Sequence, residues 1–72
     1  MNEGVQAAAA PRPVGHYPHA RRVGDLLFLS GIGPRDAATN AIPDGIEAQT
    51  RAVFANVRAV LEASGACWES MV

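Results

Sequence analysis

Residues 20–29 of the chain have the sequence ARRVGDLLFL, and this segment predicts a β-hairpin. Gly24 and Asp25 are typical turn residues, and they separate two runs, residues 20–23 and 26–29, that have the length of strands. The second run, LLFL, is apolar at every position instead of alternating with polar residues. A strand of this kind is typically covered on both faces. We therefore expect residues 26–29 to pack against a helix on one face and another element on the other.

The segment after the hairpin predicts a long loop followed by one helix. Residues 31–44 are rich in Gly, Pro, Asn and Asp, which favour irregular chain. Asp44 and Glu47 have the spacing of a capping box, in which both side chains bind backbone N–H groups at a helix start. The helix is expected to run to Ser64 and to end at Gly65, because glycine suits the left-handed position that follows a helix. Its apolar positions recur at helical spacing: Ile46, Val53, Val57, Val60 and Leu61, with Phe54 on the flank.

Residues 1–12 predict a flexible N-terminal tail. Four consecutive alanines favour helix, but so short a run does not repay the cost of helix nucleation, and prolines follow it at once. The chain has 72 residues, so it holds at most one small domain, whose core is marginal on its own. The predicted fold class is α+β, with a hairpin and one long helix that need further chain or a partner subunit for stability.

Composition excludes several classes of protein and of site. Six arginines are opposed by seven acidic residues, and the net charge of -1 gives no positive field to hold nucleic acid or an anionic membrane. The apolar runs fall short of the roughly 20 residues that span a bilayer, and Glu3 stands where a secretory signal is basic. The single cysteine, Cys67, excludes an internal disulfide. We therefore expect a cytoplasmic protein that binds neither nucleic acid nor membrane.

Few residues are candidates for chemistry. Gly31 and Gly33 follow a predicted strand, but Pro34 interrupts and no helix begins nearby, so a dinucleotide-binding loop is rejected. The backbone amides at this strand exit are still suited to a carboxylate or an oxyanion. His16 and His19 lie three residues apart without a carboxylate nearby, so surface or packing histidines are favoured over metal ligands.

Tyr17 and Cys67 complete the set of reactive side chains. A lone tyrosine in a turn is more often a packing residue than a catalytic one. Cys67 lies next to Trp68 without a basic neighbour, so it is expected to be a core thiol and not a nucleophile. From the residues alone, the chain is an α+β fragment or a small oligomeric subunit, with no metal cluster and no catalytic triad.

Several blocks of sequence, taken together, resemble the RidA (YjgF) family. Residues 13–36, PVGHYPHARRVGDLLFLSGIGPRD, contain the family's G-x-Y-x-x-A turn and its VGDLLFxSG strand. Residues 46–65, IEAQTRAVFANVRAVLEASG, are similar to the family's IExQTRxxxxNxxxxLExAG helix. Within the family, the forms GHYPHARR and SGIGPR are most similar to 2-aminomuconate deaminases.

The resemblance implies a RidA/chorismate-mutase-like fold, in which a mixed sheet is backed by helices and three subunits form a homotrimer. It also implies hydrolytic deamination of small enamine or imine carboxylates at the subunit interfaces, with neither metal nor cofactor. The catalytic residue implied in this chain is Tyr17, whose hydroxyl would face the ligand. Ser30 and Gly31 would bind the substrate at the strand exit.

Family members continue for about as many residues again, so residues 13–72 are interpreted as the N-terminal half of one RidA-like domain. The family's second half holds the arginine that pairs with the substrate carboxylate, and neither Arg35 nor Arg51 occupies that motif. We therefore expect the chain alone to be inactive. The alternatives are a generalist deaminase of 2-iminopropanoate and other reactive imines, a non-catalytic member that binds small molecules or proteins, and a truncated product without an independent role.

Overall fold

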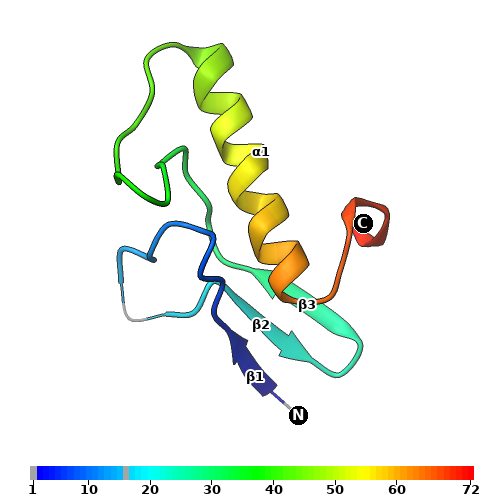
Figure 1. Ribbon diagram of the computed structural model, residues 1–72. Helices are drawn as coiled ribbons and strands as arrows, with labels where there is room; N and C mark the ends of the chain where they lie inside the picture. Colours follow the sequence, from blue (N-terminus) through cyan, green and yellow to red (C-terminus); the bar gives the residue numbers. More distant parts are fainter. Residues whose placement is uncertain (1, 16) are drawn as a thin grey trace.

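The computed structural model describes residues 2–15 and 17–72. Three strands form one antiparallel sheet in the order β1-β2-β3, where β1 is Asn2–Val5, β2 is Ala20–Val23 and β3 is Leu26–Leu29. The helix α1 (Ile46–Ala63) and the short 3₁₀ turn η1 (Trp68–Ser70) follow. Figure 1 shows the C-terminal end of α1 at the sheet, whereas the rest of the helix extends past the sheet beside irregular chain.

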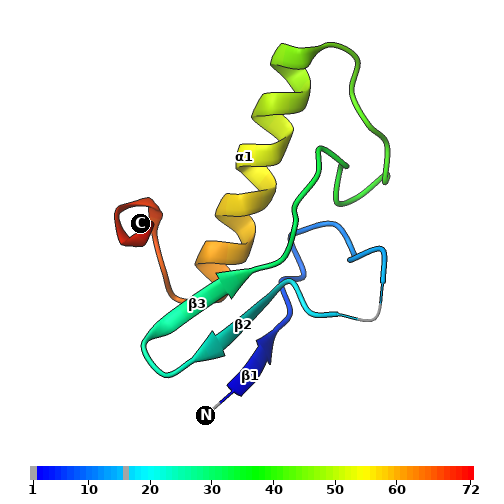
Figure 2. The ribbon, with the colours of Figure 1, turned by 180° about the vertical axis from the view of Figure 1, so that it is seen from behind.

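Strands β2 and β3 form the predicted hairpin. Ala20 pairs with Leu29, and Gly24 in the connecting turn has a φ of 58°, a left-handed value that glycine adopts without strain. Leu29 and Leu27 pack against the core around Val60, which is fully buried. Both Figure 1 and its reverse view, Figure 2, place the C-terminal end of α1 beside β3.

The predicted burial of residues 26–29 on both faces is wrong for this chain. Leu26 and Phe28 are 60% and 57% exposed. Side chains alternate between the two faces of a strand, and α1 packs against only the face that carries Leu27 and Leu29. The other face of the hairpin is therefore an open apolar surface.

The N-terminal segment differs from the flexible tail that its composition predicts. β1 pairs with β2 and extends the hairpin to three strands, and Ala7 and Ala10 are buried in the core. His19 holds the segment in place: Nδ1 accepts a hydrogen bond from the amide of Ala7 at 2.9 Å, and Nε2 lies 2.6 Å from the carbonyl oxygen of Pro11. These interactions come from residues far along the chain, so local propensity does not reveal them.

Helix α1 begins without the predicted capping box. Gly45, with a φ of 87°, occupies the N-cap position, and no side chain caps the helix there. Asp44 lies one residue too early to cap, and Glu47 instead forms an exposed ion pair with Arg51, with Oε1 and Nη2 3.0 Å apart.

The predicted end of the helix is confirmed. Gly65 has a φ of 75°, and its amide donates to the carbonyl of Glu62, while the amide of Ala66 donates to Leu61. This pair of bonds is a Schellman motif, which satisfies the last carbonyls of the helix. The side chain of Arg22 in β2 also donates to the carbonyl of Ser64, so the sheet supplies a cation to the negative end of the helix.

The apolar stripe of α1 is buried only toward its C-terminal end. Val60 and Leu61 are buried, whereas Ile46 and Phe54 are 79% and 57% exposed because the first half of the helix extends past the sheet. The ring of Phe54 meets the edge of Trp68, with centroids 5.9 Å apart. Within the described residues, no helix is both long and apolar enough to cross a membrane.

Candidate functional site

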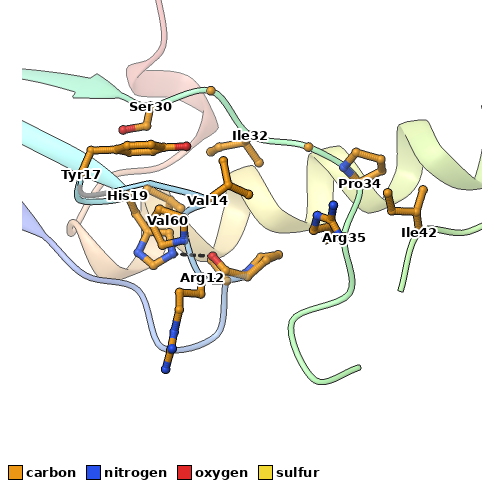
Figure 3. Close-up of a pocket in the computed structure, with 15 residues that line it drawn as sticks. Arg12, Val14, Tyr17, His19, Ser30, Ile32, Pro34, Arg35, Ile42 and Val60 are labelled. Carbon is orange, nitrogen blue, oxygen red and sulfur yellow. Dashed lines mark hydrogen bonds between the residues drawn. The ribbon is translucent and has the colours of Figure 1, made fainter. Parts of the chain in front are cut away.

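A cavity of about 350 Å³ opens between two stretches of irregular chain. Residues 10–14 form one wall with Tyr17 and His19, and residues 30–35 form the opposite wall. Val60 contributes from α1, which links the cavity directly to the core. Figure 3 shows these side chains gathered around the cavity.

The cavity brings together the three residues that the family resemblance singles out. Tyr17, Ser30 and Gly31 all line it, and Tyr17 and Ser30 lie next to each other in Figure 3. The Tyr17 ring packs over Gly15: a Cβ atom at position 15 would lie only 2.9 Å from Cε2 of the ring. Glycine at this position therefore lets the phenol take its place in the cavity wall.

Ser30 fixes the turn that carries Tyr17. Its hydroxyl donates to the carbonyl of Pro18 at 2.7 Å, and its amide donates to the carbonyl of His19 at 3.0 Å. Both hydrogens of Ser30 are therefore used within the protein, and the hydroxyl oxygen keeps only its capacity to accept. The amide of Ser30 is therefore engaged within the protein, whereas Gly31 lines the cavity.

Asn56 holds the second wall, and sequence reasoning missed it. This side chain on α1 is buried, and its Nδ2 donates to the carbonyls of Gly33 at 2.9 Å and Arg35 at 2.7 Å. It thereby attaches the loop after β3 to the helix. The available signal was its position four residues before Val60: a polar side chain on the buried face of a helix requires buried partners.

A compact turn closes the outer end of the same loop. The Asp36 carboxylate accepts hydrogen bonds from the amides of Ala38 and Thr39, at 2.8 and 2.9 Å. These backbone donors, Thr39 first, hold the pKa of Asp36 below its ordinary value by stabilising the charged form. Asn40 has a left-handed φ of 63° in this turn, and its carbonyl accepts a bond from Nη1 of Arg35 at 3.2 Å.

The remaining predicted candidates have structural surroundings or lie outside the description. His19 is a buried packing residue, one of the two roles that the sequence left open, and it lines the cavity with both ring nitrogens engaged. His16 lies outside the described residues. In the part of the chain that the structure describes, no three His, Cys, Asp or Glu side chains group as metal ligands. Cys67 is exposed, with Sγ 3.5 Å from Oγ of Ser70, so the predicted core thiol is wrong.

Residues 7–72 match the protein-family model described as Endoribonuclease L-PSP. The chain belongs to this family. Its relatives include RutC family protein SSO3206 of Saccharolobus solfataricus, which is 41% identical over 73 residues, covering all of this chain and 58% of the relative. A protein of Dermatophagoides farinae named 2-iminobutanoate/2-iminopropanoate deaminase is 36% identical, covering 94% of this chain and 54% of its own length.

Solved structures of RidA proteins have the same fold. RidA from Psychrobacter sp. PAMC 21119 superposes with a TM-score of 0.88 at 34% identity, covering 93% of this chain and 55% of that one. The Rid family protein YyfA of Yersinia pestis gives a TM-score of 0.94 at 30% identity, covering 100% of this chain and 58% of that one. The predicted RidA family and its α+β fold are therefore confirmed. The chain spans little more than half the length of these relatives.

Proposed function

We propose that the protein acts as an enamine/imine deaminase, which hydrolyses a small unsaturated amino acid and releases ammonia. The observation that carries this proposal is the cavity in which Tyr17, Ser30 and Gly31 meet, in a chain of the RidA family. The name of the Dermatophagoides relative, an imine deaminase, supports the same reaction class.

The reaction requires little from the protein beyond orientation. Water adds its oxygen to the electrophilic imine carbon and passes one proton to the nitrogen, which gives a carbinolamine. The hydroxyl proton then moves to the nitrogen as the C–N bond breaks, and a carbonyl compound and ammonia leave. Holding the water and the imine in position supplies much of the rate, and a group of the site must assist the proton transfers from water to nitrogen. The Tyr17 hydroxyl can orient the water or the substrate. The Gly31 amide can bind a substrate oxygen, and the Ser30 oxygen can accept from an N–H group.

The preferred substrate that we propose is 2-aminomuconate. The segments GHYPHARR and SGIGPR support this choice, although His16 itself lies outside the described residues. The second candidate is a generalist deaminase of 2-iminobutanoate and 2-iminopropanoate, which the name of the 36% identical relative favours. Turnover of the two substrate types separates these candidates.

We further propose that the catalytic unit includes chain beyond these residues. The relatives are nearly twice as long, so the site would be completed by a second half of the domain and by neighbouring subunits of a homotrimer. The partner is then a small enamine or imine carboxylate, with no metal, cofactor, nucleic acid or membrane, in the cytoplasm. If the site cannot be completed, a non-catalytic binding role remains.

Tyr17→Phe tests the catalytic proposal directly. Residues 1–72 joined to the remaining part of the Saccharolobus relative should release ammonia from imines generated in solution, as followed by a coupled assay. Tyr17→Phe in this fusion should lower kcat/KM by about tenfold to a thousandfold, because one proton-managing group is lost. The thermal midpoint should stay unchanged, since the ring still packs over Gly15. Equal turnover by the Phe variant would remove Tyr17 from the mechanism.

The 72-residue chain alone should release no ammonia above the uncatalysed rate. Activity of this chain would refute the need for a second half.

A further inference from the structure

The cavity has two chemically different ends. Figure 3 shows Tyr17 and Ser30 at one end and Arg35 and Ile42 at the other, well separated across the view. Between them, the lining side chains are apolar, with Val14 and Ile32 labelled there. The cavity therefore fits an elongated carbon chain that carries a polar group at each end.

Arg35 is held at its end of the cavity by two independent contacts. Its backbone carbonyl accepts from Nδ2 of the buried Asn56 at 2.7 Å, and its Nη1 donates to the carbonyl of Asn40 at 3.2 Å. Asn40 is itself fixed, because its amide donates to the carbonyl of Asp36 in the compact turn. A guanidinium carries five N–H donors, so the contact with Asn40 leaves donors for a ligand.

Charge at this end of the cavity favours an anion. Among the described residues that line the cavity, none is Asp or Glu, and the two cations are Arg12 and Arg35. The side chain of Arg12 extends away from the other lining residues in Figure 3. Arg35 is therefore the cation that can meet the far end of a bound chain, and a planar carboxylate matches its fork of donors.

We propose that Arg35 binds a second carboxylate at the far end of the substrate and so selects unsaturated dicarboxylates over monocarboxylates of the same length. This inference rests on the proposed function and deepens it, because it concerns the end of the ligand distant from Tyr17. It assigns to Arg35 a role in specificity and none in the chemical step.

A matched pair of stable ligands tests this selection. Hexa-2,4-dienedioate and hexa-2,4-dienoate share one conjugated six-carbon skeleton and differ in the second carboxylate. Titration of each into the fusion of residues 1–72 with the remaining part of the Saccharolobus relative, followed by the NMR shifts of the Gly31 and Gly33 amides, gives two dissociation constants. The dicarboxylate should bind about five- to tenfold more tightly than the monocarboxylate. A gain of this size is expected from one hydrogen-bonded charge pair at a partly exposed site.

Two variants distinguish a specific contact with Arg35 from general electrostatic attraction as the cause of the preference. Arg35→Met should bring the two dissociation constants within about twofold of each other and leave the monocarboxylate constant unchanged. Arg12→Met removes a neighbouring cation that points elsewhere, so it should retain the preference. The amide spectrum of each variant shows whether its fold is intact.

The outcomes distinguish this inference from the proposed function. Equal binding of both ligands by the parent fusion, or a preference that survives Arg35→Met in the fusion, would overturn the role of Arg35 and leave the deaminase proposal standing. Loss of the preference in Arg12→Met alone would also overturn it. Failure of both ligands to shift the Gly31 and Gly33 amides would reject the cavity as the substrate site, and both proposals with it.

Discussion

At the scale of single residues, the G-x-Y-x-x-A turn has a direct physical meaning in this structure. Gly15 leaves room for the Tyr17 ring, and Ala20 is 1% exposed because it lies in the core cluster with Val60. The family resemblance singled out Tyr17, which lines the cavity, whereas residue chemistry alone favoured a packing role. A tyrosine in a turn gains its position from Ser30, which bonds the adjacent Pro18 across 12 residues of chain, and no local pattern encodes that contact.

His19 should be the most sensitive single residue of the N-terminal segment. His19→Leu leaves the buried amide of Ala7 and the carbonyl of Pro11 without their partners, which should cost about 1–3 kcal/mol of unfolding free energy. Urea unfolding followed by circular dichroism measures this loss. Hydrogen exchange of the Ala7 amide should accelerate in the same variant.

His19→Gln is the matched control, because an amide side chain supplies both a donor and an acceptor. It should lose less stability than the leucine variant. If His19→Leu unfolds at the same urea concentration as the parent chain, the two hydrogen bonds do not hold the N-terminal segment.

At the scale of elements, the β2–β3 hairpin and the end of the helix were predictable, whereas the start of the helix was not. The Gly65 signal is local: a left-handed residue after a helix favours glycine wherever it occurs. The capping box depends on the residue that becomes the N-cap, and here the chain enters the helix through Gly45 with a positive φ. Because the N-cap is Gly45 and not Asp44, neither Asp44 nor Glu47 takes its predicted capping role.

The attachment of the cavity loop to α1 should depend on the amide of Asn56. Asn56→Asp replaces the shared donor with a carboxylate that faces the carbonyl oxygens of Gly33 and Arg35, so stability should fall by about 1–3 kcal/mol at neutral pH. This repulsion raises the pKa of the new carboxyl. The loss of stability should therefore become smaller as the pH falls, because the protonated carboxyl can donate a hydrogen bond. Urea unfolding at several pH values measures both effects.

Gln49→Glu provides a control on the same helix, because Nε2 of Gln49 also donates to a loop carbonyl, that of Pro43, at 2.9 Å. Only one bond is lost there, near the solvent-exposed start of α1, so the destabilisation should be smaller. Equal losses in Asn56→Asp and Gln49→Glu would mean that Asn56 has no special part in holding the cavity wall.

At the scale of the whole molecule, the described chain leaves one face of its sheet uncovered. The continuous apolar run of residues 26–29 correctly indicated a strand with two apolar faces, but α1 covers only one of them. The same reasoning missed β1, because residues 2–5, NEGV, show no alternation of apolar and polar residues and the strand depends on its pairing with β2. The open face thus contains large apolar side chains, Leu26 and Phe28, that the described residues leave exposed.

This open face should drive self-association, since exposed apolar patches of this kind mark interaction surfaces. Phe28→Ser removes the largest side chain from the face and should shift the chain toward monomer, as measured by sedimentation equilibrium over a range of concentrations. Phe54→Ser is a closely matched control, because Phe54 is equally exposed, at 57%, but lies on α1 against Trp68. Phe54→Ser should leave the association constant within about twofold of the parent value. If both variants weaken assembly alike, general hydrophobicity drives the contact; if neither does, copies of the chain do not meet through this sheet face.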